Sequence, residues 1–348
     1  MKGEQITACS ICGGQPGLKH GFCPGYQQPD TYQIYHCSHC NTAFALPRHA
    51  TDALYETIYK LSDKIPGYER YHRYTREIKD HNNPLEYLAQ AEEAYWGVKV
   101  ALQQLVKDKS STTILEIGSG LGYLTYALNQ AKYNVLGLDI SQTAVERAIN
   151  NFGAHYLFTD LFEYATTHPA TFDVVILTEV MEHVENPLAF ITALNKLLKP
   201  GGHAIITTPN KSFYFKDILW STELPPVHFW WFSETSITRL ANHAGMQISF
   251  IDFSAFYQNR YLAIDMKKLS CSPPQQPVLN QSGELIKSNN HLNKHSNSPI
   301  RAMLSEIPIL LKLYRRIKAS FNKNLVVCSL RGPILCAILQ KPQDFFAP

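Results

Sequence analysis

The sequence lacks any long apolar run, since no stretch of its 348 residues approaches the 18 or so that a membrane-spanning helix needs. Its first residues, MKGEQITACSIC, lack the apolar core of a secretory signal, so we expect a cytoplasmic protein. A strong net charge is also missing, because +3 is too small to indicate a nucleic-acid partner by itself. With 45% apolar and 18% charged residues, the composition excludes a wholly disordered chain. The length suggests two domains, or one large domain with an appendage.

The small net charge is unevenly distributed. From Leu285 onward there are ten Lys or Arg residues and only two acidic ones. We expect a basic amphipathic helix at 301–321, whose apolar stripe favours packing against a sheet, with contact to an anionic membrane surface as the alternative. Residues 270–300 are rich in Ser, Asn, Gln and Pro, which predicts a disordered loop.

Cysteine is scarce except near the N-terminus, where five of the eight residues fall within the first 40. Without a secretory signal we expect no disulfide framework, so the pattern points to a metal. Cys9 and Cys12 form one CxxC pair, and Cys37 and Cys40 form another. Two such pairs suit the tetrahedral thiolate coordination of zinc, so residues 1–48 are predicted to form a zinc ribbon. Four further groups are candidates for substitute ligands or neighbours: His20, Cys23, His36 and His39.

Strand-like and helical patterns alternate through the middle of the chain. A Tyr-rich stretch and a helix from about 84 to 107 come first, in a segment that spans 49–110. Strands are expected at 113–117, 134–139, 155–159, 172–178, 203–208, 246–254 and 332–342, and helices near 122–131, 142–151, 187–199 and 234–244. Alternation of this kind predicts an α/β fold with a parallel sheet and crossover helices.

The strongest local motif is ILEIGSGLG at 114–122, an apolar strand that leads into closely spaced glycines and a helix. Glycines let the backbone turn sharply and approach a ligand. Glu116, before the first glycine, would repel a pyrophosphate but attract a cationic amino group. Asp139 ends the next strand, 23 residues later, where a carboxylate accepts hydrogen bonds from ribose hydroxyls.

Residues 112–256 and the last strand resemble class I S-adenosylmethionine-dependent methyltransferases. The resemblance rests on five segments in order: LEIGSGLG, LGLDIS, FTDLFEY, FDVVILTEVMEHVENP and LLKPGGHAIITTPN. It implies a Rossmann-like sheet, mostly parallel with an antiparallel last strand, and S-adenosylmethionine as cofactor. By this resemblance Asp139 binds the ribose, Ile140 packs on the adenine, and Asp160 and Leu161 lie at the adenine amino group. The other cofactor-binding residues that it implies are Glu116, Gly118, Gly120, Gly122, Tyr123 and Glu179.

The zinc ribbon followed by the Tyr-rich segment resembles the N-terminus of bacterial methyltransferases that act on sugars, glycans and secondary metabolites. This resemblance implies that residues 49–110 form a helical lid over the acceptor site. The methyltransferase core would then span 111–256, followed by an insertion at 257–331 and by the last core strand and tail at 332–348.

The loop ELPPVHFWWFS at 223–233 resembles an acceptor-facing loop of the same group. Transfer to a hydroxyl or a carbanion needs a base, and an imidazole titrates near neutrality, so His228 is the candidate catalytic base. Phe229, Trp230 and Trp231 either form flat walls for the acceptor or pack against the following helix. Similar sugar C-methyltransferases carry His-Glu-His where this chain has Pro-Val-His, which favours O-methylation over C-methylation.

Glu179, Glu182 and His183 form an ExxEH cluster after the strand at 172–178. With His228 they offer carboxylate and imidazole ligands for Mg²⁺ or Mn²⁺. The arrangement resembles metal-assisted methyltransferases of quinone biosynthesis and of small-RNA 3′ ends. In metal-free relatives the same residues shape the cofactor pocket, so both interpretations stay open.

We therefore expect methyl transfer from S-adenosylmethionine to a small-molecule or glycan acceptor, most simply at a hydroxyl. The alternatives are a sugar C-methyltransferase, a zinc-ribbon binding protein with a degenerate methyltransferase domain, and an RNA methyltransferase. The intact Glu116 and Asp139 argue against a degenerate domain. Residues 1–60 carry four basic and four acidic residues, which argues against a phosphate-binding face and a nucleic-acid partner.

Overall fold

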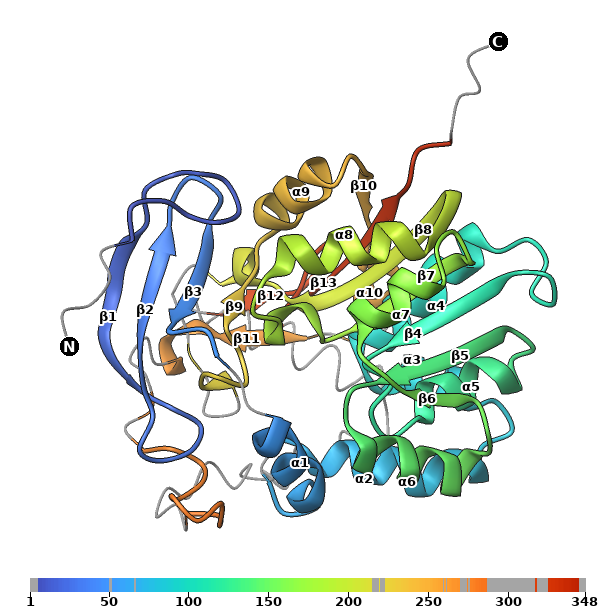
Figure 1. Ribbon diagram of the computed structural model, residues 1–348, viewed down its shortest axis with the longest axis horizontal. Coiled ribbons are helices and arrows are strands. Elements are labelled where there is room, and N and C mark those ends of the chain that lie inside the picture. Colours follow the sequence, from blue (N-terminus) through green and yellow to red (C-terminus); the bar gives the residue numbers. More distant parts are fainter. Residues whose placement is uncertain are drawn as a thin grey trace.

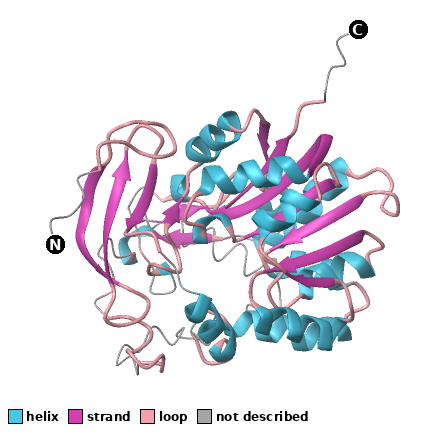
Figure 2. Cartoon of the chain, in the orientation of Figure 1, coloured by secondary structure: helices cyan, strands magenta, loops and turns pink. Residues whose placement is uncertain are grey.

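The computed structural model describes residues 6–49, 52–65, 67–214, 219, 223–258, 260, 262–269, 274, 276–286, 317 and 325–343. A four-stranded sheet at the N-terminal side lies next to a seven-stranded sheet (Figure 1). Figure 2 shows that helices surround the large sheet, whereas the small sheet is built from strands and loops. None of the helices in these ranges combines the length and the apolar composition that a membrane span requires.

The seven-stranded sheet has the order β10-β13-β8-β7-β4-β5-β6. Its strands are β4 (Thr113–Ile117), β5 (Asn134–Asp139), β6 (Tyr156–Phe158), β7 (Phe172–Thr178), β8 (Leu198–Pro209), β10 (Gln247–Phe250) and β13 (Ile334–Gln340). Strands β4 to β8 are parallel, whereas β13 runs antiparallel to both β8 and β10. The predicted α/β, Rossmann-like sheet with an antiparallel last strand is therefore confirmed.

Apolar residues on alternate positions of each central strand build a core on either face of this sheet. In β7, Val175 and Leu177 belong to one core, and Val174 and Ile176 belong to the other. The first core is covered by α7 (Leu161–Thr167), α8 (Pro187–Leu197) and α9 (Glu234–His243), and the second by α3 (Pro84–Ala91), α4 (Glu93–Leu105) and α5 (Tyr123–Gln130). Helix α6 (Gln142–Phe152) packs beside β5 and β6. The short helix α7 was not among the predicted helices.

The Tyr-rich segment forms α1 (Asp52–Leu61), α2 (Glu69–Glu77) and a 3₁₀ turn at Ile78–Asp80. The prediction of one helix from 84 to 107 is wrong, because the chain breaks between α3 and α4 at Glu92, where the backbone is extended (φ −140°, ψ 150°). The Glu92 carboxylate accepts a hydrogen bond from the hydroxyl of Tyr74 (2.6 Å) and pairs with Arg70 (3.1 Å). Contacts with α2 thus accompany the break.

The N-terminal ribbon is an antiparallel meander of β1 (Gly17–Pro24), β2 (Thr31–Cys37) and β3 (Thr42–Leu46). Its fourth strand, β9 (Trp230–Trp231), comes from the distant loop at 223–233 and pairs with β3. Buried residues of the ribbon, such as Ile34 and Phe44, belong to the same apolar core as Leu177 of β7. The ribbon is therefore packed into the body of the molecule.

Part of the insertion is ordered, contrary to the prediction of a disordered loop at 270–300. Leu279 is fully buried, and the N–H groups of Val278 and Leu279 both donate to the carbonyl of Tyr26 in the ribbon (2.9 Å each). Two apolar residues within a polar stretch suffice to anchor it. The other described elements are α10 (Ser254–Gln258), the paired strands β11 (Ala263–Asp265) and β12 (Leu325–Val327), and 3₁₀ turns at Met181–His183, Lys211–Phe213 and Met266–Lys268. The basic helix predicted at 301–321 lies outside the described residues, apart from Ile317.

Candidate active site

A cavity of about 750 Å³ lies at the carboxyl ends of β4, β5 and β7. Ligands bind at this edge in parallel α/β sheets because the loops that follow the strands converge there. Four tyrosines of the N-terminal helical segment line the cavity wall: Tyr55, Tyr59, Tyr68 and Tyr71. These tyrosines belong to residues 49–110, the segment that the sequence predicts to form a lid over the acceptor site.

The glycine loop forms one wall of the cavity. Gly118 has a left-handed backbone (φ +73°), and a Cβ atom there would lie 2.5 Å from a methyl group of Val180. Of the residues here that the sequence predicts to bind the cofactor, Gly118, Gly120 and Tyr123 line the cavity, whereas Gly122 does not. A Cβ at Gly122 would meet Ala148 of α6 at 2.6 Å, so this glycine lets the start of α5 approach α6.

Glu116 points a buried carboxyl group into the cavity from the end of β4. Its side chain accepts a hydrogen bond from Thr125, and the residue is 2% exposed. Burial raises the pKa of Glu116 to about 8, because a carboxylate loses hydration there. A bound cation would compensate for that loss, so the site favours a positively charged ligand group.

Asp139 ends β5 on the adjacent wall. Its two carboxylate oxygens accept the backbone N–H groups of Gly120 (2.7 Å) and Ser141 (2.8 Å), one each. Each oxygen retains a lone pair, so the carboxylate is able to accept hydroxyl hydrogens as well. Ile140 follows on the cavity wall and is 53% exposed, which leaves an apolar surface for a flat ligand.

Asp160 has a structural role that the sequence analysis missed. Its Oδ1 atom accepts the N–H groups of Phe162 (2.7 Å) and Glu163 (3.1 Å), so it caps the N-terminus of α7. Asp160 and Leu161 also line the cavity, together with the exposed residue Phe162. The capping pattern of an Asp before a helical turn would have been the signal.

Glu179 follows β7 with a left-handed backbone (φ +55°) and accepts the hydroxyl of Thr207 (3.0 Å). Burial raises its pKa to about 8, and the charge of Arg70 opposes that rise. Arg70 of α2 is the only Lys or Arg among the described residues of the cavity wall, and it donates to the hydroxyl of Tyr71 (2.7 Å). The sequence did not single it out, because nothing local distinguishes it from Arg73 and Arg76 on the same helix.

Three polar side chains of the cavity wall lie close together. One ligand atom from each of Glu182, His183 and His228 lies within 4.8 Å of the others, whereas Glu179, which the sequence placed with them, is not part of the group. The Oε2 atom of Glu182 accepts the hydroxyl of Thr208 (2.9 Å). The Oε1 atom of Glu182 and the Nδ1 atom of His228 are buried without a hydrogen-bond partner.

The ionisation of this group follows from its burial. Burial raises the pKa of Glu182 and lowers the pKa of both His183 and His228. The two imidazoles are therefore neutral at physiological pH, which is the form that binds a metal or accepts a proton. Two buried polar atoms without hydrogen-bond partners, in a group whose ligand atoms lie within 4.8 Å of one another, fit a cation site.

The aromatic residues after His228 do not line the cavity. Phe229, Trp230 and Trp231 are at most 6% exposed, and Trp230 donates its indole N–H to the carbonyl of Val184 (2.9 Å). Of the two interpretations of these residues, walls for the acceptor and packing, the structure supports packing. Glu223, which accepts the indole N–H of Trp231 (3.0 Å), does reach the cavity wall.

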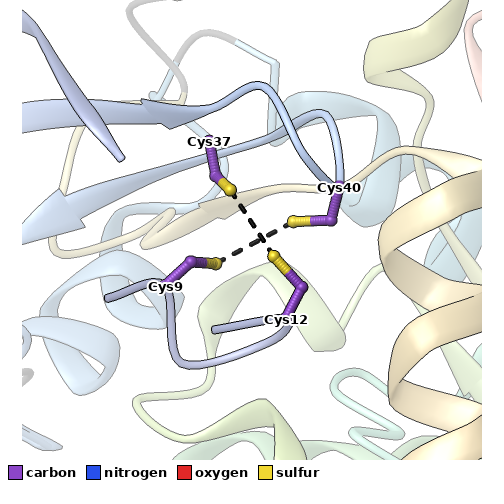
Figure 3. Close-up of side chains that lie close together, drawn as sticks. All are labelled: Cys9, Cys12, Cys37 and Cys40. Carbon is purple, nitrogen blue, oxygen red and sulfur yellow. Dashed lines mark hydrogen bonds between the residues drawn. The ribbon is translucent and has the colours of Figure 1, made fainter. Parts of the chain in front are cut away.

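The four cysteines of the two CxxC pairs meet in one cluster beside β2 and β3 (Figure 3). The sulfur of Cys9 lies 3.8 Å from that of Cys40, and the sulfur of Cys12 lies 3.5 Å from that of Cys37. Tetrahedral zinc with Zn–S bonds of about 2.3 Å separates its sulfur ligands by roughly 3.8 Å, so the cluster fits this ion. A hydrogen bond from Cys40 lowers the pKa of Cys9 to about 5, which favours a thiolate. The alternative candidates His20, Cys23, His36 and His39 are not in the cluster.

Curated relatives match part of the chain. A protein from Azoarcus sp. (strain BH72), named ubiquinone biosynthesis O-methyltransferase, is 35% identical over 105 residues, which are 29% of this chain and 45% of that protein. A protein of the same name from Pectobacterium carotovorum subsp. carotovorum is 31% identical over 137 residues, which are 37% of this chain and 52% of that protein. The chain thus spans about half the length of the curated relatives it matches.

Among solved structures, the chain is similar to a SAM-dependent methyltransferase from Archaeoglobus fulgidus, with a TM-score of 0.41 and 16% identity over 70% of this chain and 93% of that one. It is also similar to an S-adenosylmethionine-dependent methyltransferase from Mesorhizobium loti, with a TM-score of 0.41 and 15% identity over 72% of this chain and 99% of that one. The family described as methyltransferase domain matches residues 88–249, which include the glycine loop, Asp139, Asp160 and the cluster of Glu182 and His228. Residues 88–249 are therefore similar to a methyltransferase domain over a little less than half of the chain.

Proposed function

We propose that this protein binds S-adenosylmethionine in the cavity and transfers its methyl group to a hydroxyl of a small-molecule acceptor. The observation that carries the proposal is the pair of buried carboxyl groups, Glu116 and Asp139, on either side of the glycine loop. A cofactor with both an ammonium group and a ribose satisfies the two at once.

Each part of the cofactor has a partner on the cavity wall. The Glu116 carboxylate would bind the ammonium group of the methionine moiety, and Asp139 would accept both ribose hydroxyls. Ile140 would pack on the adenine ring, with Asp160 at its amino group. Arg70, the only Lys or Arg among the described residues of the wall, would bind the methionine carboxylate.

The acceptor would lie next to His228. Catalysis of methyl transfer comes mainly from holding the acceptor atom in line with the methyl–sulfur bond, and His228 would remove the acceptor proton. The names of the curated relatives support oxygen as the acceptor atom and a small molecule as the acceptor. A glycan acceptor and sugar C-methylation are the alternatives that the loop at 223–233 keeps open.

A second candidate role for His228 is metal binding. The donor set of Glu182, His183 and His228 suits Mn²⁺ better than Mg²⁺, which prefers oxygen ligands alone. The carbonyl of Val227 orients His183 through its Nδ1 atom, which leaves Nε2 for a metal. When bound, such a cation would lower the pKa of a coordinated acceptor hydroxyl.

We also propose one structural zinc ion, held by Cys9, Cys12, Cys37 and Cys40.

Calorimetry with S-adenosylhomocysteine tests the cofactor assignment. Replacing Asp139 with Ala removes the acceptor of the ribose hydroxyls, so we expect a loss on the order of 1.5–3 kcal/mol, or roughly tenfold to a hundredfold in affinity. Asp252→Ala, at an exposed position outside the cavity, is the matched control. Unchanged binding in the Asp139 variant would mean that the cofactor binds elsewhere.

A separate experiment identifies the acceptor. Cell extracts are incubated with the protein and labelled S-adenosylmethionine, and the labelled products are identified by mass analysis.

A further inference from the structure

The backbone that carries His228 is aligned by the ribbon. Strand β9 begins two residues after His228 and belongs to the sheet of β1, β2 and β3 (Figure 1). Within the described residues β9 pairs only with β3, with Trp230 opposite Phe44 and Trp231 opposite Ala43. The N–H group of Ala45 extends this ladder by donating to the carbonyl of Phe229 (2.8 Å). The residue next to His228 is therefore fixed by a strand almost 200 residues away in sequence.

Side chains strengthen the same junction. The hydroxyl of Thr42 donates to the carbonyl of Trp231 (3.1 Å), and the hydroxyl of Ser233 donates to the carbonyl of Cys40 (2.8 Å). Thr42 and Ser233 are both fully buried, so water does not replace these bonds. Because Cys40 belongs to the four-cysteine cluster, the hydrogen bond from Ser233 joins this cluster directly to the chain after β9.

On its other side the loop contacts the segment that carries Glu182 and His183. The N–H group of Phe229 donates to the carbonyl of Glu182 (2.8 Å), and the carbonyl of Val227 bonds the ring of His183. The His228 ring lies 4.7 Å from the His183 ring, centre to centre, and its Nδ1 atom has no hydrogen-bond partner. The position of His228 thus depends on hydrogen bonds of Val227 and Phe229, one of which comes from Ala45 of the ribbon.

We infer that the ribbon is a positioning device for the methyl-transfer site, with Thr42 as a positioning residue that holds His228 against Glu182. Filling the cysteine cluster with zinc would fix the turn at Cys37–Cys40, and through β3 and β9 it would fix His228. The inference rests on the proposed function for its effect on turnover. Its structural part, that the ribbon orders residues 227–233, is independent of that function.

A matched pair of substitutions tests the role of Thr42. Thr42→Val keeps the shape and removes the hydroxyl, whereas Thr42→Ser keeps the hydroxyl and removes the methyl group. We expect Thr42→Val to speed hydrogen exchange in residues 227–233 by about tenfold and to lower kcat by about tenfold or more. The affinity of Thr42→Val for S-adenosylhomocysteine should not change. Thr42→Ser should keep both the hydrogen exchange of residues 227–233 and kcat close to their wild-type values. Leu18→Ala, at an exposed position on β1 far from the β3–β9 junction, is the control.

A second measurement covers the case in which Thr42→Val does not fold. Removing zinc from the wild-type protein with a chelator should increase exchange in residues 227–233 while the glycine loop at 116–123 stays protected in the presence of S-adenosylhomocysteine. The inference would be overturned if hydrogen exchange in residues 227–233 stayed as slow as in the zinc-loaded wild-type protein, either after zinc removal or in a folded Thr42→Val protein. If the wild-type protein does not bind S-adenosylhomocysteine, the result contradicts the proposed function and not the positioning role of the ribbon. The ribbon does not line the cavity, so its positioning role makes no claim about cofactor binding.

Discussion

Glu116 shows how one buried group links binding to pH. Its carboxyl group has a pKa of about 8 in the free protein because burial removes the hydration of the charged form. An ammonium group placed beside it would restore the charged form, so its pKa in the complex would fall. The bound state then holds fewer protons than the free state at any pH between the two pKa values.

Binding of S-adenosylhomocysteine should therefore release protons. At pH 7 we expect close to one proton per site, and affinity should rise with pH until about 8 and then level off. Calorimetry in two buffers of different ionisation enthalpy measures the number of protons that are released per site. Glu116→Gln should abolish the release, and Glu179→Gln controls for a second carboxyl group on the wall whose pKa is raised to about 8. Wild-type binding without proton release near pH 7 would mean that Glu116 does not meet the ammonium group.

His228 behaves differently from the expectation based on an ordinary imidazole. The sequence predicted a base that titrates near neutrality, but burial and the neighbouring His183 lower its pKa well below that range. The neutral form, which is the active form of a base, therefore exists throughout the physiological range. The rising limb of a pH–rate profile would lie on the acid side of neutrality.

Turnover of His228→Ala should fall by roughly a hundredfold or more, with affinity for S-adenosylhomocysteine nearly unchanged. If His228 acts as a base, wild-type turnover should be flat from pH 7 to 8 and insensitive to chelator. If His228 is a metal ligand, chelator should abolish wild-type activity and Mn²⁺ should restore it. A fully active, metal-independent variant would remove His228 from the mechanism.

At the scale of elements, the ends of helices decide how the cavity wall is built. Asp160 faces the cavity and also caps α7, so one side chain serves both the binding surface and the helix. The break at Glu92 is similar, because the carboxylate that bonds Tyr74 also pairs with Arg70 on the cavity wall. Substitutions at such positions affect folding and binding together.

Asp160→Ala should lower the free energy of unfolding by about 1 kcal/mol, since two N–H groups of α7 lose their acceptor. Asp160→Asn should preserve most of that stability, because an amide oxygen caps a helix nearly as well. Thr166→Ala, on the exposed side of α7, provides the control. Urea unfolding measures all three, and an Asp160→Ala protein as stable as the wild type would contradict the capping role.

At the scale of the whole molecule, the ribbon and the domain of the seven-stranded sheet share one apolar core, and strand β9 pairs with β3 of the ribbon. Within the described part of the ribbon, the four cysteines are the group that would hold a metal ion. Its four sulfurs are already close to tetrahedral spacing, so zinc binding needs little rearrangement.

Elemental analysis of protein purified without chelators should find about one zinc per chain. Cys37→Ser should release it and loosen the ribbon, while the cofactor domain stays folded and still binds S-adenosylhomocysteine. Cys23→Ser is a stringent control, because Cys23 is also buried in the ribbon but lies outside the cluster. Metal-free wild-type protein, or equal zinc content in the two variants, would refute the zinc site.

The sequence by itself determined the features that depend on neighbouring residues. The order of the seven strands of the large sheet follows from short apolar patterns, and the glycine loop follows from the residues that must turn there. The positions of Glu116 and Asp139 at strand ends placed them at one edge of the sheet, because parallel strands end on the same side. The spacing of the CxxC pairs likewise predicted a cluster that the structure contains.

Only the tertiary structure decided the features that depend on distant pairs. The pairing of β9 with β3 and the approach of Arg70 to Glu179 join residues between 109 and 188 positions apart. No local pattern encodes such contacts, since they arise when separate elements bury their apolar faces against one another. The pKa of His228 belongs to the same class, because it is set by the residues that exclude water from its ring and by the imidazole beside it.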